Sequence, residues 1–496
     1  MLSRNVPILK STVMNSIKQK TMMTIRSFVF LKVHCTGRWK AHREIQCTPD
    51  NTRLVERSRV WPAATWLMSL AFASQCFVSR ADWPEFLGPN RNGTIPENSA
   101  LPISWSASDG SKENGKKENV KWVTPTLGLG WSSPVVVGNR IYITAARNAS
   151  AKGDSKDLTG AQELALCCYN ADNGALLFDR KIFDQPADAP NIHKKNSHAS
   201  PTVFAHTDSA SKQTSLYVHF GHQGTARVTL DGEVQWIDRE HTYNPVHGNG
   251  GSPIVVGQNL ILTCDGSEKP YTLALDTRTG KEVWRTPRGI TTDRPFSFAT
   301  PQAIEVAGKT QVISPGSDIV QSLDPKTGQV LWSVKYSGFS LIVRPLYHRG
   351  LVFISTGYMS PKLLAIDPTG SGDVTDTHVR WTVSTAVPNT PSLVPVGDQI
   401  VMVSDGGVAT GLQVSDGKKL WQKRLGGNYS ASPLAVGNRV YFQSEGGEAI
   451  VMEVGETPDE LGRSSLPGRV FSSYAVHEND FIIRTEEGLY RIGGKP

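Results

Sequence analysis

The stretch GGSPIVVGQNLILTCDGSEKPYTLALDTRTGKEVWRT, residues Gly250–Thr286, decides the fold class because it reads as one complete four-stranded sheet. Short runs of alternating apolar residues are separated by turns rich in Gly, Asn and Asp, which is typical of an antiparallel meander. The Val-Gly-Gln step at 256–258 supplies hairpin residues that tolerate positive φ. The last strand carries Trp284.

This unit recurs along the chain. A lone sheet of this size cannot bury both faces, whereas sheets stacked radially in a closed ring can. We therefore predict an all-β fold, an eight-bladed β-propeller of four-stranded antiparallel blades, with a seven-bladed ring as the alternative. The other seven copies begin at Ser132, Ala199, Ala299, Val343, Asn389, Ser430 and Phe471.

The two ends of the repeat region indicate how the ring closes. The last unit, Val470–Ile492, has three strands and stops before its Trp strand. The segment Glu118–Gly128 reads as an orphan outer strand with Trp122. We expect this N-terminal strand to complete the last blade.

Outer-strand tryptophans are expected to dock each blade onto its neighbour. Burying a large apolar side chain stabilises a fold by about 2–3 kcal/mol, so each contact would hold two blades together. The six docking candidates are Trp122, Trp236, Trp284, Trp332, Trp381 and Trp421.

Charge and hydropathy separate a leader from the body of the chain. Residues 1–81 hold 13 Lys/Arg and 3 Asp/Glu, a net charge of +10, and the remaining 39 basic and 42 acidic residues give −3. Three arginines precede the apolar run Trp61–Ser74, and small residues precede Asp82, which matches a secretory signal cleaved after Ala81. Cys76 raises a lipoprotein alternative, although AFASQ before it fits a lipid-attachment box poorly.

These features divide the chain into 1–81, an N-terminal extension and secretory signal segment; 82–117, a linker; and 118–496, the propeller. We expect an exported monomer, periplasmic or extracellular, with no membrane span in the mature chain, because the apolar run is too short. A slightly acidic body lacks the basic surface that nucleic acid requires. Beyond the leader only Cys167, Cys168 and Cys264 remain, which is no disulfide framework.

The segments ALDTRTGKEVW (Ala274–Trp284) and SLDPKTGQVLW (Ser322–Trp332) resemble the pyrroloquinoline quinone (PQQ) propeller repeat, also called the tryptophan-docking motif. The resemblance extends over about 118–496. The opening ADWPEFLGPNRNGT looks like that of exported PQQ-like propellers of planctomycete-type bacteria. Such repeats occur in quinoprotein alcohol dehydrogenases, in the propeller subunit of the outer-membrane barrel assembly machinery and in bacterial kinase sensors, so the resemblance implies a fold and leaves the chemistry open.

Residues just before each small-residue–Pro step should surround the channel, because the innermost strand starts each unit. Imidazole, amide and guanidinium groups gathered there could bind an anionic or polar ligand, or a transition metal. The alternative is that they are solvated or hydrogen-bonded between blades. No ligand spacing favours a metal, and no metal site is assigned. The ligand-binding candidates are Asn196, His198, His222, His247, Asn249, Arg344, Asn389 and Tyr429.

A PQQ-dependent alcohol dehydrogenase is the enzymatic alternative. It would need PQQ, a Ca²⁺ held by carboxylate and amide oxygens, and a carboxylate base. The resemblance also raises a vicinal disulfide at Cys167–Cys168, but alignment with the other units places both cysteines inside a strand. The available acids are Asp265, Asp318, Asp376 and Asp405, in no recognisable constellation.

We therefore assign no catalytic residue and no cofactor. The leading prediction is a binding or scaffold protein whose partner is an unidentified ligand or envelope protein at the channel mouth. An envelope assembly adaptor is the third reading.

Overall fold

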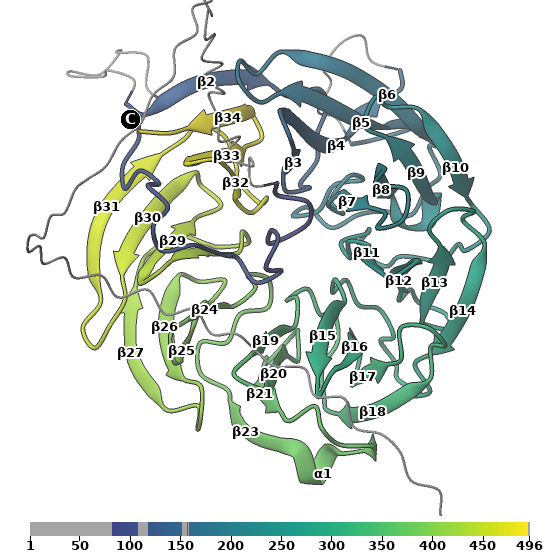
Figure 1. The fold of residues 1–496 in the computed structure, drawn as a ribbon, viewed down its shortest axis with the longest axis vertical. Helices are drawn as coiled ribbons and strands as arrows, with labels where there is room; N and C mark the ends of the chain where they lie inside the picture. Colours follow the sequence, from purple (N-terminus) through teal and green to yellow (C-terminus); the bar gives the residue numbers. More distant parts are fainter. Residues whose placement is uncertain (1–81, 108–117, 151–155, 157, 495–496) are drawn as a thin grey trace, which may run out of the picture. The chain divides into compact units, whose positions relative to one another are not determined.

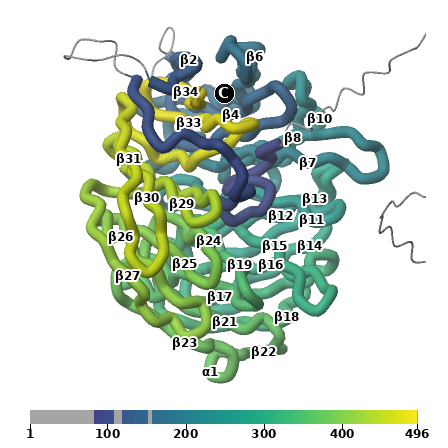
Figure 2. The backbone as a smooth tube through the Cα atoms, turned by 60° about the vertical axis from the view of Figure 1, so that its left-hand side comes forward, coloured from purple at the N-terminus to yellow at the C-terminus, as the bar shows by residue number. Residues whose placement is uncertain are grey.

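The computed structural model describes residues 82–107, 118–150, 156 and 158–494. The expected leader, its cleavage site and Cys76 lie outside the described residues. Eight antiparallel sheets of four strands stand around a common axis (Figure 1), so the all-β, eight-bladed prediction is confirmed over the seven-bladed alternative. Figure 2 shows the same ring turned toward its edge. None of the helices in these ranges is long and apolar enough to cross a bilayer.

Each blade runs outward from the channel in chain order. Blade 1 holds β3 (Val135–Val137), β4 (Arg140–Asn148), β5 (Gln162–Asn170) and β6 (Leu176–Gln185). Blade 2 holds β7 (Phe204–Thr207), β8 (Thr214–His219), β9 (Thr225–Thr229) and β10 (Val234–Asp238), with the 3-10 turn η1 (Gly221–Gln223). Blade 3 holds β11 (Ile254–Val256), β12 (Asn259–Cys264), β13 (Tyr271–Asp276) and β14 (Glu282–Pro287). Blade 4 holds β15 (Gln302–Val306), β16 (Lys309–Gly316), β17 (Ile319–Leu323) and β18 (Val330–Lys335).

The second half of the ring repeats the pattern. Blade 5 holds β19 (Leu346–His348), β20 (Leu351–Ser355), β21 (Leu363–Ile366) and β23 (Val379–Val383), preceded by helix α1 (Thr375–His378). Blade 6 holds β24 (Val394–Val396), β25 (Gln399–Val403), β26 (Val408–Gln413) and β27 (Lys419–Arg424). Blade 7 holds β28 (Leu434–Val436), β29 (Arg439–Gln443), β30 (Glu448–Glu453) and β31 (Asp459–Ser465). Blade 8 holds β32 (Ala475–His477), β33 (Asp480–Arg484) and β34 (Gly488–Ile492).

The N-terminal strand closes blade 8. β2 (Val120–Pro125) pairs antiparallel with β34, with Val123 opposite Tyr490, so the predicted closure is confirmed. The Lys121 ammonium adds an ion pair of 2.8 Å to Asp480. Two short strands exceed the predicted count: β22 (Gly372–Asp373) extends blade 4 at its outer edge, and β1 (Thr94–Ile95) extends blade 7 at its inner edge.

Most of the outer-strand indoles connect neighbouring blades through their N–H groups. Four of the six candidates donate to a backbone carbonyl of the next blade at 2.9–3.0 Å: Trp122 to Ala171, Trp236 to Thr277, Trp284 to Pro325 and Trp381 to Val414. The other two, Trp332 and Trp421, donate to a glutamine of their own blade, Gln311 and Gln399.

A turn glycine lies beneath each indole that crosses to the next blade. Gly280, at φ +72°, is so close to Trp236 that a Cβ would lie 2.8 Å from the ring. Gly280 in the T-x-T-G turn of blade 3 is therefore required for two reasons, its positive φ and its close contact with the indole.

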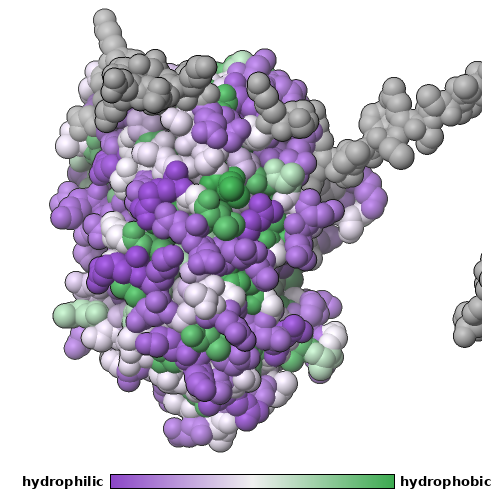
Figure 3. Space-filling view, turned by 90° about the vertical axis from the view of Figure 1, so that its left-hand side faces the viewer, coloured by the Kyte–Doolittle hydropathy of each residue, from purple (hydrophilic) through white to green (hydrophobic). Residues whose placement is uncertain are grey.

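The face of the outer wall in Figure 3 is mainly polar, with small apolar groups among the polar residues. Around the ring, exposed apolar residues of the outer strands include Val123, Leu177 and Leu420. Scattered exposed residues of this kind are usual on soluble proteins.

Residues 82–107 differ from the linker expectation. Trp83, Leu101 and Trp105 are buried in the core shared by blades 7, 8 and 1. The segment crosses the centre of the ring between the innermost strands (dark purple in Figure 1) before reaching β2. Sequence patterns missed it because it contains no copy of the repeat.

Candidate functional site: a pocket in the propeller channel

A ring of hydroxyl groups surrounds the channel. At the start of the innermost strand, a Ser or Thr hydroxyl accepts a hydrogen bond from the backbone N–H of the corresponding residue in the preceding blade. Seven such bonds of 2.9–3.1 Å connect neighbouring blades. The hydroxyl belongs to the residue before a Pro in four units and to a residue just after the Pro in two, Thr202 and Ser392, whereas Ser473 has no Pro beside it. The hydroxyl ring thus connects neighbouring blades. The acceptors are Ser133, Thr202, Ser252, Thr300, Ser392, Ser432 and Ser473.

Arg344 takes the eighth place in this ring. Its guanidinium donates to Glu85 Oε2 at 2.7 Å and to the carbonyl of Phe86. Both charged side chains are buried, 0% and 5% exposed. Burial lowers the pKa of Arg344, although Glu85 opposes that change. The ion pair therefore holds residues 82–95, which we call the plug, in the middle of the channel.

The plug contacts blades on several sides of the ring. Trp83 bridges to Val136 of β3, Ala205 donates to the Pro84 carbonyl at 2.8 Å, and Ala435 donates to the Gly93 carbonyl at 2.8 Å. The Asp82 carboxylate accepts from the N–H of Gly138, in the turn after β3. Because Trp131 precedes β3, the plug enters from the end of the channel opposite Trp131.

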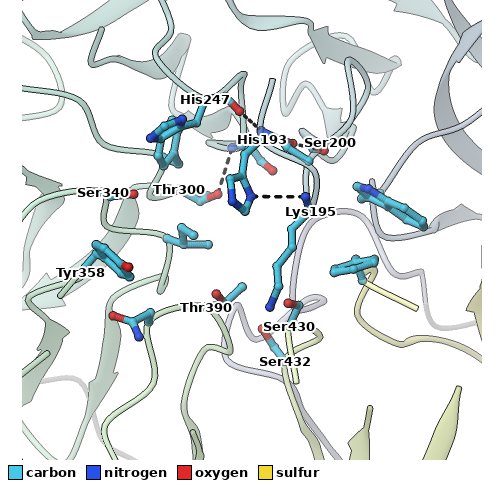
Figure 4. A pocket seen from close by; sticks show the side chains of 18 of the residues that line it. His193, Lys195, Ser200, His247, Thr300, Ser340, Tyr358, Thr390, Ser430 and Ser432 are labelled. Atoms are coloured by element: carbon cyan, nitrogen blue, oxygen red, sulfur yellow. Dashed lines mark hydrogen bonds between the residues drawn. The ribbon is translucent and has the colours of Figure 1, made fainter. Parts of the chain in front are cut away.

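A pocket of about 760 Å³ lies above the plug, with Phe86 among its lining residues. This volume is in the range of small-molecule sites. Hydroxyls of the ring face it, as Figure 4 shows for Thr300 and Ser432. The lining also includes Trp131, His193, Lys195, Asn196, His247, Arg294, Phe296, Phe298, Phe339, Ser340, Ile342, Tyr358, Asn389, Thr390, Asp405, Ser430 and Phe471.

Aromatic rings form a continuous wall on one side. His247 packs edge-on to Phe296 at 5.3 Å between ring centroids, Phe296 packs on Phe339 at 5.7 Å, and Phe339 packs on Tyr358 at 5.8 Å. Across the pocket, Trp131 and Phe471 lie 4.7 Å apart. Such rings give apolar contact area with little conformational freedom to lose.

Cationic groups gather at the rim. The Arg294 guanidinium lies 4.5 Å above the centre of the Phe339 ring, is solvent-exposed, and has no ion pair within the described residues. Lys195 reaches across the mouth to Glu445 at 2.7 Å. Burial, and then His247, lower the pKa of His193. The rim is therefore basic near neutral pH and becomes more so as the pH falls.

Three of the eight predicted ligand residues line the pocket. Asn196 and His247 are joined, since the Asn196 amide donates to the His247 carbonyl at 2.9 Å. Asn389 lies against Asp405, whose carboxylate accepts its backbone N–H at 2.7 Å. These three remain binding candidates.

The other five predicted residues lie away from this pocket. Arg344 holds the plug from beneath it. Tyr429 is buried, with its N–H on the carbonyl of Asp405. His198 bonds Gln185 at 3.1 Å and lines a second cavity of about 380 Å³. Most of the eight candidates were chosen because they lie just before a small-residue–Pro step. That criterion located the strand starts correctly, but it could not tell which side chains face the channel.

The half-buried His222 and the buried Asn249 form a cluster between blades 2 and 3. The Asn249 amide lies 3.2 Å from His222 Nδ1. Burial lowers the pKa of His222, and also that of the nearby His219, to about 4. Within the described ranges, His, Cys, Asp and Glu side chains form no group of three that could hold a metal ion.

The donor set does not fit a Ca²⁺–PQQ pair. Asp405 is the single acid among the lining residues, and its oxygens already accept from Asn389 and from the Thr390 hydroxyl at 2.8 Å. Asp265 is paired with Arg288 at 2.6 Å with neither side chain exposed above 1%. Ca²⁺ takes six to eight oxygen ligands, and this pocket offers no such group.

The other acids considered for a dehydrogenase site already accept hydrogen bonds or lie far from the pocket. Asp318 accepts from the Gly338 N–H and the Thr292 hydroxyl, and Asp376 lies on helix α1 outside the ring. Cys167 and Cys168 are free, buried neighbours on β5. Burial raises the pKa of each thiol to about 12.

Comparisons with known proteins agree with the fold. A family model described as "Outer membrane protein assembly factor BamB" matches residues 105–294 and 371–457, more than half of the chain. The chain belongs to this family of PQQ-like propellers. No curated protein matches the chain.

Solved structures of PQQ-like propellers are similar at low identity. A europium-containing methanol dehydrogenase is 10% identical over 82% of this chain and 90% of its own, with a TM-score of 0.51. BamB from Moraxella catarrhalis is 14% identical over 75% of this chain and 98% of its own, with a TM-score of 0.49. At 10% identity, the likeness to the dehydrogenase structure shows the propeller fold alone.

Proposed function

We propose that this PQQ-like propeller is an exported binding protein that takes a small ligand into the pocket above the plug. The observation that carries the proposal is the combination of a closed floor, an aromatic wall and a basic rim in one cavity of ligand size. A channel that served only to join blades would not need its lower end plugged by a buried ion pair. The leader-like N-terminal sequence supports export.

A pocket-blocking variant tests this function without a known ligand. Ile342 lines the pocket and is 37% exposed, so Ile342→Trp should fill the mouth without strain in the core. Leu420→Trp is the matched control, because Leu420 is 43% exposed on β27, an outer strand.

A compound library is then screened by thermal shift against the three proteins. We expect compounds that stabilise the wild type and Leu420→Trp but not Ile342→Trp. A screen in which every stabilising compound acts equally on Ile342→Trp would refute the pocket as the binding site.

Export is tested separately. In a Gram-negative host, mass spectrometry of the periplasmic fraction should find a chain beginning at Asp82. A full-length chain retained in the cytoplasm would contradict it.

An envelope assembly adaptor is the second candidate. Tyr358 and Met359, 53% and 67% exposed, continue the aromatic wall onto the surface beside the pocket. A photo-crosslinking residue at position 359 should then capture one envelope protein, and one at position 420 should not. Crosslinks of the same pattern from both positions would reject the adaptor reading.

A further inference from the structure

The hydroxyl ring has unused hydrogen-bonding capacity. Each ring hydroxyl accepts a backbone N–H, and within the described chain none of them donates its own proton to another group. The six that line the pocket are at least 95% buried. A hydroxyl has one donor and two acceptor positions, so these side chains present O–H donors to the cavity.

Three of the hydroxyls higher in the pocket are different because they already donate their protons to other side chains. Thr390 donates to Asp405 at 2.8 Å, Ser430 to Glu445 at 2.6 Å, and Ser200 to Asn196 at 2.6 Å. Six unused O–H donors thus lie together at the floor, next to the plug. An acceptor-rich group of a ligand would accept hydrogen bonds from several of them.

The charged side chains of the pocket also favour a negatively charged ligand. Asp405 is its single lining acid and is satisfied by Asn389 and Thr390, whereas Arg294 has no carboxylate partner in the described chain. Hydrogen bonds to an ionised acceptor are about twice as strong as neutral ones. Donors at the floor and a free guanidinium at the rim select an anion.

The aromatic side chains of the pocket wall favour an apolar, flat body for the remainder of the ligand. Phe296, Phe298 and Phe339 on one side and Trp131 and Phe471 on the other leave an apolar space between aromatic surfaces. A flat aromatic body would contact both walls.

We propose that the pocket binds aromatic carboxylates, with the carboxylate on the hydroxyl floor and the ring system between the aromatic walls. This inference rests on the proposed function and adds the chemical class of its ligand. No metal or redox step is involved, and binding forms and breaks no covalent bond.

The test compares four small probes by isothermal titration calorimetry: 2-naphthoate, 2-naphthamide, 2-naphthylmethylammonium and acetate. We expect 2-naphthoate to bind, the neutral amide and the ammonium to bind at least tenfold more weakly, and acetate to show no saturable binding. Equal or tighter binding of the amide or the ammonium would overturn the inference. Absence of 2-naphthoate binding would overturn it as well.

Variants locate the carboxylate's partners. Arg294→Gln removes a positive charge from the rim and should weaken 2-naphthoate about threefold, through the longer-range attraction of that charge for the carboxylate. Arg285→Gln is the matched control, since Arg285 lies 4.6 Å over Tyr271 outside the pocket and should change affinity less than twofold. Ser432→Ala removes one floor donor and should weaken 2-naphthoate but leave 2-naphthamide nearly unchanged. Equal losses for both probes would indicate damage to the ring and overturn the floor assignment.

The pH dependence gives a further readout. His193 faces His247, Lys194 and Lys195, and its pKa is lowered by burial first. Because its pKa lies below the ordinary value near 6.5, His193 gains positive charge only well below that pH, so 2-naphthoate should bind more tightly as the pH falls from 8 toward 5. Weaker binding at pH 5 would contradict an anion site.

Failure of this inference is distinguishable from failure of the proposed function. If the library yields neutral or cationic compounds that Ile342→Trp excludes, the pocket is a binding site for another class. If no compound is excluded by Ile342→Trp, the proposed function itself fails.

Discussion

Replacing Glu85 with Gln should destabilise the whole propeller, although Glu85 lies outside the repeat region. The substitution leaves the Arg344 guanidinium, 0% exposed, without its counter-ion. Arg91 also loses its 2.8 Å partner on the same carboxylate, although it is partly exposed. Breaking a buried ion pair by removing one partner costs about 3–5 kcal/mol, so Glu85→Gln should lower the free energy of unfolding by that amount.

Urea denaturation followed by fluorescence measures this change, provided that the slope with denaturant is unchanged. Glu460→Gln is the control: its pair with Arg463 at 3.0 Å is on the surface, and its loss should cost at most about 1 kcal/mol. The double variant Glu85→Leu with Arg344→Met should lose less than Glu85→Gln alone, because no charge remains buried. A loss below 1 kcal/mol for Glu85→Gln would refute the reasoning that this pair fixes the plug.

Three other predictions concern the remaining structure. Gly280→Ala should cost about 1–3 kcal/mol more in urea denaturation than Gly257→Ala, because both glycines have positive φ but only Gly280 lies against an indole; equal losses would reject the Trp236 contact. Burial lowers the pKa of His219 to about 4, below its unfolded value near 6.5, so stability should be complete above pH 6.5 and fall by up to about 3 kcal/mol toward pH 4; His219→Gln should flatten that fall, and an unchanged profile would count against it. Because burial raises the pKa of Cys167 and Cys168 to about 12, a thiol reagent at pH 8 should label neither until the protein is unfolded, and rapid labelling of the native chain would contradict their burial.

Most of the fold could be predicted from the sequence because the pattern of a four-stranded sheet occurs eight times along the chain. The closure was also predictable: Trp122 belongs to a strand without a sheet, and the last unit is a sheet without its outer strand. Both the repeat and the closure of the ring follow from the alternation of apolar residues within each strand and from the number of strands in each unit.

The plug could not be predicted in this way. Glu85 and Arg344 are 259 positions apart and occur in different kinds of sequence, one irregular and one repetitive. A single signal was present: Arg344 stands where Ser or Thr occurs in the other seven units. The break in that pattern marks the position where another segment enters the channel.

The site was predicted only in part for a related reason. The repeat gives the height of a residue along the channel axis but not the direction of its side chain. Asn196, His247 and Asn389 line the pocket, whereas His222 and Asn249 turn into the gap between blades. The stacked wall of Phe296, Phe339 and Tyr358 comes from three separate loops, which the repeat pattern does not place relative to one another.

A crystal structure of the protein grown with 2-naphthoate tests the account most directly. We expect electron density for the naphthalene ring between Phe296 and Trp131, its carboxylate within 3.2 Å of two neighbouring ring hydroxyls such as Ser252 and Thr300, and the plug in place beneath it. Density for the probe outside the channel, or a channel open from end to end with Glu85 away from Arg344, would contradict it.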